Sequence, residues 1–92
     1  MSDSITREFI IQNALGLHAR AATKLAQLAS KFPCEVDVSR EGEVANAKSV
    51  MGLLLLCGSQ GTSIEVTATG ERASECLTAI EALLNDKFGE GR

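Results

Sequence analysis

The stretch CEVDVSREGEVANA, residues 34–47, decides the fold. Beginning at Cys34, apolar residues alternate with charged or polar ones over the first six positions. This two-residue period is typical of a β-strand with one buried face. The sequence Arg-Glu-Gly-Glu at 40–43 predicts a hairpin turn into a second strand over residues 44–47. A sheet with one apolar face needs a cover, and we expect the flanking segments to supply it.

The segments that precede this hairpin predict a strand, a loop and a helix. Residues 5–12 are rich in Ile and Phe and predict a strand, and residues 13–17 predict a turn-like loop. Residues 19–32 carry apolar side chains at three- and four-residue steps, with polar ones at the same period on the other face. This is an amphipathic helix that Pro33 is expected to end, because proline lacks the backbone donor and disfavours helix at the preceding residue.

The segments after the hairpin predict a second helix and a fourth strand. Ser49 is a good N-cap for a short helix that reaches about residue 56. Residues 58–61 predict a loop, and the alternating segment 64–69 predicts a strand.

The segment after residue 70 predicts a long amphipathic helix. Glu71 suits its N-terminus, Lys87 its C-terminus and Gly89 a C-cap. The element order is therefore β-α-β-β-α-β-α. We predict one α+β domain, with its core over about residues 5–88, in which three helices cover one face of a four-stranded antiparallel sheet as an open-faced sandwich.

Composition restricts the classes of function. The chain has 92 residues, a formal net charge of −3 and three aromatic residues, all Phe, so it lacks the basic stripe or stacking rings that nucleic-acid binding usually requires. Cys34, Cys57 and Cys76 share no CxxC spacing and stand in apolar settings, so we expect them to pack in the core. With no leader-like or long apolar segment, we expect a cytoplasmic protein without membrane insertion, metal or cofactor, whose partners are proteins.

The only histidine, His18, stands where the predicted loop becomes a helix. A helix start presents unpaired N–H groups and the positive end of the helix dipole, which stabilise an anion. The neutral imidazole is a nucleophile, and Arg20 adds a fixed charge with donors suited to phosphate oxygens. These groups suit a residue that accepts and passes on a phosphoryl group. The short pattern is also compatible with a solvated surface residue or a simple helix cap.

A second informative segment is NAKSVMG, residues 46–52. A serine at a helix N-cap is common, and its capping role accounts for Ser49 locally. The short helix that follows carries more apolar side chains than one buried face requires. Val50 and Met51 therefore suggest an adaptable, exposed docking surface, although the same side chains are compatible with core packing.

Taken together, the motifs GLHAR at 16–20 and KSVMG at 48–52 resemble those of the HPr family over about residues 5–88. HPr is the histidine-containing phosphocarrier of the bacterial phosphoenolpyruvate-dependent sugar phosphotransferase system. The resemblance implies that His18 carries phosphate on Nδ1 and that Arg20 helps to hold it. It also implies that the phosphoryl group arrives from enzyme I and leaves to an enzyme IIA.

The resemblance further implies regulation and a partner surface. Ser49 matches the serine that an HPr kinase/phosphorylase modifies in many bacteria. Charge added there would oppose acidic or apolar partners. The residues expected at the partner surface are Leu17, Ala19, Thr23, Lys24, Lys48, Val50 and Met51.

The chain departs from the family pattern in its first helix. Ala21 stands where the family usually has proline, which suits the first helical turn. Alanine is a good helix former, so we expect the helix to persist with a somewhat looser loop. The family's basic residues also appear thinned, with Gln27 and Ser30 facing outward while Lys24 and Lys31 remain. These departures bear on which partners are used.

Three other functions compete with a sugar-branch phosphocarrier. One is an NPr-like carrier of the nitrogen-related branch, which transfer to one type of enzyme IIA or the other would distinguish. A second is a regulatory binding module that acts through Ser49 and the Val50/Met51 surface with His18 silent. A third is an autonomous enzyme such as a histidine phosphatase, but one His, one nearby Arg and no evident pocket argue against it.

Overall fold

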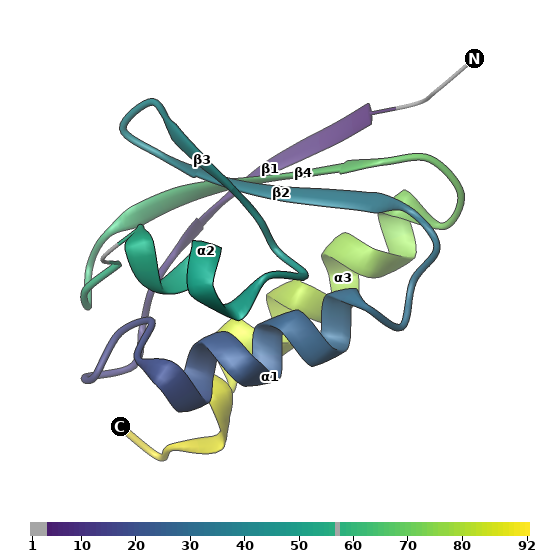
Figure 1. The fold of residues 1–92 in the computed structure, drawn as a ribbon. Coiled ribbons are helices and arrows are strands. Elements are labelled where there is room, and N and C mark those ends of the chain that lie inside the picture. The colour runs from purple at the N-terminus through teal and green to yellow at the C-terminus, as the bar shows by residue number, and fades with distance from the viewer. Residues whose placement is uncertain (1–3, 57) are drawn as a thin grey trace.

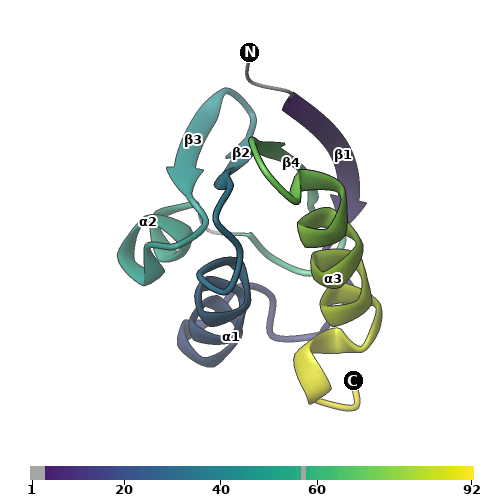
Figure 2. The same cartoon turned by 90° about the vertical axis from the view of Figure 1, so that its right-hand side faces the viewer.

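The computed structural model of the chain describes residues 4–56 and 58–92. In these described residues, three α-helices lie on one face of a single antiparallel sheet, whose strand order is β1-β4-β2-β3 (Figures 1 and 2). The elements in chain order are β1 (Ser4–Ile10), α1 (Ala19–Ala29), β2 (Glu35–Arg40), β3 (Glu43–Asn46), α2 (Val50–Leu55), β4 (Ser63–Thr69), α3 (Ala73–Asn85) and the 3₁₀ turn η1 (Lys87–Gly89). The predicted α+β class and element order are confirmed.

The predicted hairpin is present with shifted ends. Glu41 and Gly42 both have positive φ, 50° and 86°, as a two-residue type I′ turn requires. Glu43 therefore pairs with Arg40, so β3 begins one residue earlier than predicted and ends at Asn46.

The edge strand β1 is also shorter than predicted. It ends at Ile10 rather than at residue 12. The next residue, Ile11, still donates its N–H to the Thr62 carbonyl at 3.0 Å and accepts from the Gly61 N–H at 2.8 Å. These bonds tie the chain to the loop before β4 and so anchor the start of the segment that leads to α1.

Helix α1 ends at Ala29, before the predicted end at Phe32. The Phe32 N–H donates to the Ala29 carbonyl at 3.1 Å, which is the i→i+3 bond of a tightened last turn. Pro33 disfavours helical angles at Phe32, so this tightened turn over residues 30–32 does not continue beyond it.

The end of α3 differs most from the sequence prediction. The helix ends at Asn85, and the φ angles of Lys87 and Phe88 are 53° and 55°, in the left-handed region. This reversal turns the chain so that the Phe88 side chain is buried. The predicted roles of Lys87 and Gly89 at the helix end are therefore wrong, and Gly89, with φ +77°, closes the 3₁₀ turn instead.

The start of α3 also differs from the prediction. Glu71 precedes the helix, whose first turn carries Glu75. Arg72 is the N-cap, with left-handed φ of 64° and no side-chain cap bond, and its guanidinium donates to Glu75 at 3.1 Å.

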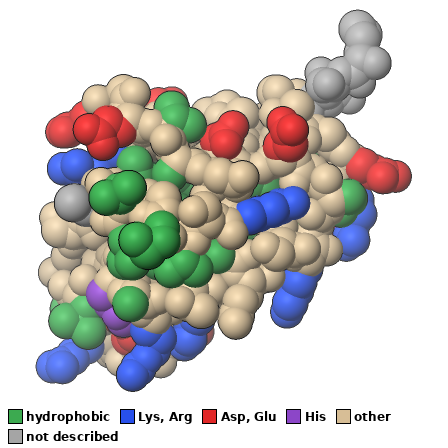
Figure 3. Space-filling view, in the orientation of Figure 1, with side chains coloured by type: hydrophobic (Ala, Val, Ile, Leu, Met, Phe, Trp, Pro, Cys, Tyr) green, Lys and Arg blue, Asp and Glu red, His purple; other side chains and the backbone are tan. Residues whose placement is uncertain are grey.

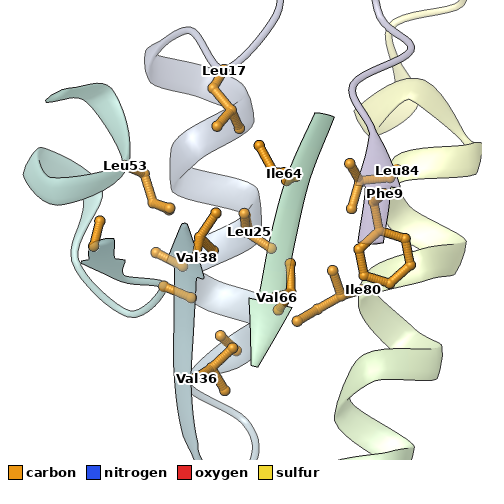
Figure 4. Packing of buried hydrophobic residues seen from close by; sticks show 14 of the residues in the cluster. Phe9, Leu17, Leu25, Val36, Val38, Leu53, Ile64, Val66, Ile80 and Leu84 are labelled. Atoms are coloured by element: carbon orange, nitrogen blue, oxygen red, sulfur yellow. The ribbon is translucent and has the colours of Figure 1, made fainter. Parts of the chain in front are cut away.

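The core fills the space between the sheet and the helices (Figure 4). The inward strand residues alternate as predicted, for example Ile64 and Val66 on β4, which face Leu25 of α1 and Ile80 of α3. Among the described residues, no helix combines the length and apolar character that a membrane span requires.

Two of the three cysteines lie in this core. Cys34 and Cys76 are free and buried, as predicted, and Cys57 lies outside the described residues. Burial, together with the neighbouring Cys34 thiol, raises the pKa of Cys76 to about 12. A thiol with so high a pKa is a packing group rather than a nucleophile at neutral pH.

Candidate functional site

His18 is the N-cap of α1, so the chain becomes helical at the predicted place. Its backbone is extended (φ −73°, ψ 176°), and its Nδ1 accepts a hydrogen bond from the Arg20 N–H at 3.3 Å. A backbone N–H only donates, so Nδ1 holds a lone pair. That lone pair lies at the positive end of the helix dipole, where an anion bonded to Nδ1 would be stabilised.

The loop before His18 is held by glycine and by a buried amide. Gly16 has φ +67°, and a Cβ at this position would meet the backbone of Gly58 and lie 2.9 Å from Ser59 Cα. Asn13 is fully buried, and its Nδ2 donates to the Gly16 carbonyl at 2.8 Å. Glycine is therefore required here both by backbone angle and by space.

His18 and Arg20 line one small pocket, although the sequence indicated none. Its volume is about 290 Å³, and its lining residues are Leu15, His18, Arg20, Gly89, Glu90 and Arg92. Two arginines, a histidine and a glutamate thus line a space with room for a phosphoryl group. The predicted convergence of His18 and Arg20 is present in the structure.

The sequence reasoning did not find Glu90, which contacts the other side of the imidazole. Its Oε2 lies against His18 Nε2, and its Oε1 accepts from Asn13 Nδ2 at 2.9 Å. Burial alone would raise the pKa of Glu90. The hydrogen bonds from Asn13 and His18 outweigh it and hold the pKa of Glu90 below its usual range, together with the charge of Lys24 and that of His18 when the ring is protonated.

Ser49 caps α2 as predicted. Its Oγ accepts from the Gly52 N–H at 3.1 Å, and its carbonyl accepts from the Leu53 N–H at 3.1 Å. The side chain is partly exposed. Its position places any added charge at the start of a short helix whose outer face is apolar.

Apolar side chains are exposed near both helix starts. Met51 is 69% exposed and Leu55 is 73% exposed on α2, and Leu15 is 62% exposed in the loop before α1. Figure 3 shows hydrophobic side chains gathered beside the histidine, with Lys and Arg on its other side. A groove of about 410 Å³ between α1 and α2 is lined by Thr23, Ala26, Gln27, Ser30, Lys48 and Val50.

Comparison with known proteins places this chain in a family. The family described as "PTS HPr component phosphorylation site" matches residues 5–86. The chain belongs to the HPr family. It is accordingly a phosphocarrier of the phosphotransferase system (PTS) rather than a catalytic enzyme, and its family implies enzyme I and enzyme IIA as partners.

Individual HPr relatives match over nearly their whole length. The phosphocarrier protein HPr of Xylella fastidiosa is 44% identical over 86 residues, which cover 94% of this chain and 97% of that one. The phosphocarrier protein NPr of Shewanella violacea is 46% identical over 86 residues and 94% of each chain. The crystal structure of HPr-C-His from Thermoanaerobacter tengcongensis has a TM-score of 0.90 at 38% identity and covers 94% of this chain and 97% of that one. The expected HPr fold is thereby confirmed.

The HPr helix α1 tolerates the alanine that replaces the usual proline. Ala21 is buried within the first turn, and the first i→i+4 bond, from the Ala22 N–H to the His18 carbonyl, is 2.8 Å long. The helix therefore persists, as expected. Gln27 and Ser30 are exposed, also as expected.

The partner surface expected for this HPr chain requires one correction. Leu17 is only 5% exposed, and its side chain packs beside Gly58 in the core, so it is not a surface residue. The side chain that points outward from this loop is Leu15. The resemblance alone placed Leu17 on the surface; the turn closed by the Gly16 N–H to Asn13 carbonyl bond, and the bond from the Leu17 N–H to the Gly58 carbonyl, instead turn its side chain inward.

The other expected surface residues of this HPr chain lie at or near the surface. Ala19 is exposed, Val50 is partly buried, and Thr23 Oγ1 donates to the Ala19 carbonyl at 2.7 Å. Lys24 Nζ donates to the Phe88 carbonyl at 2.6 Å, and Lys48 Nζ donates to the Phe32 carbonyl at 2.9 Å. Both ammonium groups therefore form hydrogen bonds with backbone carbonyls of the fold.

Proposed function

We propose that His18 accepts a phosphoryl group on Nδ1 from phosphorylated enzyme I and donates it to an enzyme IIA. The lone pair of Nδ1 at the start of α1 carries this proposal. Arg20 lines the same pocket, where its guanidinium can bind phosphoryl oxygens in the fork geometry suited to them.

The transfer uses only groups already present. The Nδ1 lone pair forms the bond to phosphorus, while the bond between phosphorus and the donor enzyme breaks and its electron pair stays with the donor. Enzyme IIA reverses the step from its own side. The helix N–H groups and Arg20 stabilise the phosphoryl charge from one side of an open site, which suits a carrier that must also release the group.

The first test is intact-mass analysis after incubation with phosphoenolpyruvate and enzyme I. We expect one acid-labile phosphoryl group on the wild type and none on His18→Ala. Ser74→Ala, which changes an exposed residue of α3, should be phosphorylated as the wild type is. A phosphorylated His18→Ala would contradict the assignment, as would an unmodified wild type beside a control HPr that is phosphorylated in parallel.

We also propose that partners dock on the apolar surface formed by Leu15, Val50, Met51 and Leu55, with Ala19 and Thr23 at its margin. Exposed large apolar side chains that adjoin a reactive residue are suited to transient protein contacts. Met51 adds an adaptable side chain, which helps one surface to accept two different partners.

Ser49 is a proposed regulatory site, the substrate of an HPr kinase/phosphorylase where the cell has one. Phosphorylation would add about −1.5 to −2 charges beside this apolar surface. We expect Ser49→Asp to slow phosphoryl transfer from enzyme I about tenfold or more, because an apolar or acidic partner surface must then approach a fixed anion. Rates measured by quenched flow for Ser49→Asp and Ser49→Ala test this. Equal rates for Ser49→Asp and wild type would rule out control by charge.

The branch of the PTS is a separate question, because the relatives include both HPr and NPr proteins. We infer the sugar branch, in the cytoplasm, as the main role, with an NPr-like role in the nitrogen-related branch as the alternative. Transfer from phosphorylated protein to purified sugar-type and nitrogen-type enzyme IIA, compared in one assay, decides between them.

A further inference from the structure

The chain after α3 packs against the start of α1 at several points. Phe88 is buried in the core, and its carbonyl accepts from Lys24 Nζ at 2.6 Å. The Ala14 N–H donates to the Arg92 carbonyl at 3.0 Å. The segment between these anchors therefore holds Glu90 beside His18.

The carboxylate of Glu90 is nearly enclosed. Its side chain is 9% exposed, with Oε1 on Asn13 Nδ2 and Oε2 on His18 Nε2. Asn13 is itself fully buried and fixed through the Gly16 carbonyl. The carboxylate is thus positioned by the same loop that positions the imidazole.

The two sides of the imidazole require the same proton arrangement. On one side, the Arg20 N–H can only donate, so Nδ1 carries no proton. On the other side, the lowered pKa of Glu90 keeps the carboxylate ionised and acceptor-only, so Nε2 carries the proton. A group on each side of the ring therefore selects the tautomer with a free Nδ1 lone pair.

We propose that Glu90 is a positioning residue for phosphoryl transfer, which holds the proton on Nε2 of His18 and so keeps Nδ1 the reacting nitrogen in both directions. The proposal rests on His18 as the phosphoryl acceptor.

The same proton serves both half-reactions. When Nδ1 accepts the phosphoryl group, the ring gains a positive charge while its proton stays on Nε2, opposite the Glu90 carboxylate. When the group leaves, the N–P bond breaks, its electron pair returns to Nδ1, and the ring departs as neutral imidazole. Without the Nε2 proton, the leaving group would be an imidazolate anion, which is far more basic and leaves more slowly. No proton is taken up or released in either step.

Among the described charged groups around the site, Glu90 is the one placed to stabilise the proton on Nε2. Arg20 and Lys24 come from α1, and Arg92 from the chain end, and each positive charge disfavours the protonated phospho-imidazole. Asp86, at the end of α3, lies on the Gly89 side, 3.9 Å from where a Cβ of that residue would stand. Glu90 is the carboxylate that contacts the ring among the described residues.

The test compares Glu90→Gln with Glu81→Gln in the full chain, because Glu81 is an exposed carboxylate on α3 that lies outside this pocket. Each protein is phosphorylated by enzyme I, and donation to enzyme IIA is followed against pH. In Glu90→Gln we expect the pH at which donation falls to half to move down by about one unit. At pH 8 we expect donation to be about tenfold slower, with an unchanged enzyme IIA concentration for half-maximal rate. Glu81→Gln should match the wild type.

A second readout needs no phosphorylation. The ¹⁵N spectrum of the neutral imidazole reports which nitrogen carries the proton. We expect one Nε2–H tautomer in the wild type and in Glu81→Gln, and a mixture of tautomers in Glu90→Ala. Unchanged ring spectra together with unchanged pH profiles would overturn the role of Glu90. A wild type that takes no phosphoryl group would instead refute the proposed function, and the ring spectra would still decide whether Glu90 controls the proton.

Discussion

The starts of α1 and α2 share a local motif and differ in everything around it. Each begins with a polar side chain that accepts a hydrogen bond from a backbone N–H. His18 Nδ1 accepts from the Arg20 N–H at 3.3 Å, and Ser49 Oγ accepts from the Gly52 N–H at 3.1 Å. His18 is also contacted by Glu90, which is 72 residues away in sequence. Among the described residues, the Ser49 hydroxyl has only its cap bond.

This difference separates the proposed phosphoryl acceptor from a structural cap. The long cap bond to His18 uses the lone pair that would react, and the proton on the opposite nitrogen is held by a distant carboxylate. In the described part of the chain the Ser49 hydroxyl contacts no base, so the proposed phosphorylation would require a base supplied by the kinase. A capping pattern in the sequence therefore indicates where a helix begins, whereas contacts from distant segments determine the chemical properties of the capping side chain.

The largest expected effect comes from the same substitution made at both helix starts. Gly16→Ala puts a Cβ into the backbone of Gly58 at left-handed φ, and we expect it to lower the free energy of unfolding by about 3 kcal/mol. Gly52→Ala meets Ala45 Cβ and Ser49 Oγ at 3.3 Å while gaining helix propensity, so we expect a change within about 1 kcal/mol. Urea denaturation of both variants measures this difference in the free energy of unfolding. Similar losses of stability in the two variants would contradict the prediction.

A smaller effect is expected when the structural cap is removed. Ser49→Ala leaves the Gly52 N–H without its side-chain acceptor, and we expect a loss of about 1 kcal/mol in unfolding free energy. Phosphorylation of His18 by enzyme I should keep its wild-type rate. Ser74→Ala, at an exposed position in α3, serves as the stability control and should cost nothing. A slower acceptance at His18 in Ser49→Ala would show that the two helix starts are coupled.

The smallest expected effect is the pH dependence of stability due to Glu90. Because its pKa is lower in the folded chain than in the unfolded one, its contribution is fully present above the unfolded pKa and is lost as pH falls through the folded one. The Tm advantage of wild type over Glu90→Gln should therefore be present at about pH 6 and shrink as pH falls below about 4. An advantage that grows on acidification would contradict the lowered pKa.

Local patterns were enough to predict most of the architecture. The alternation around Val36 and Ile64, the helical period of residues 19–32 and the cap at Ser49 each depend on neighbours within a few positions, which a single sequence displays. The end of α1 ahead of Pro33 is a local effect too, since proline acts on the residue before it.

The parts that escaped prediction depend on distant contacts. Glu90 has no spacing relation to His18, because the reversal at Lys87 and Phe88 brings it there. Left-handed φ at two non-glycine residues is unfavourable on its own and persists because Phe88 is buried. Leu17 was misplaced for a similar reason, since only the packing of its loop against Gly58 decides which leucine turns inward.

The Ala14–Arg92 hydrogen bond has a practical consequence for how this protein is handled. The start of β1 and the chain end at Arg92 lie at opposite ends of the molecule (Figure 1). An affinity tag, dye or surface linker fused after Arg92 would be attached beside the imidazole and would compete with partners for access. The same attachment ahead of β1 would leave that side open, so immobilised or labelled forms for kinetic work are best anchored there.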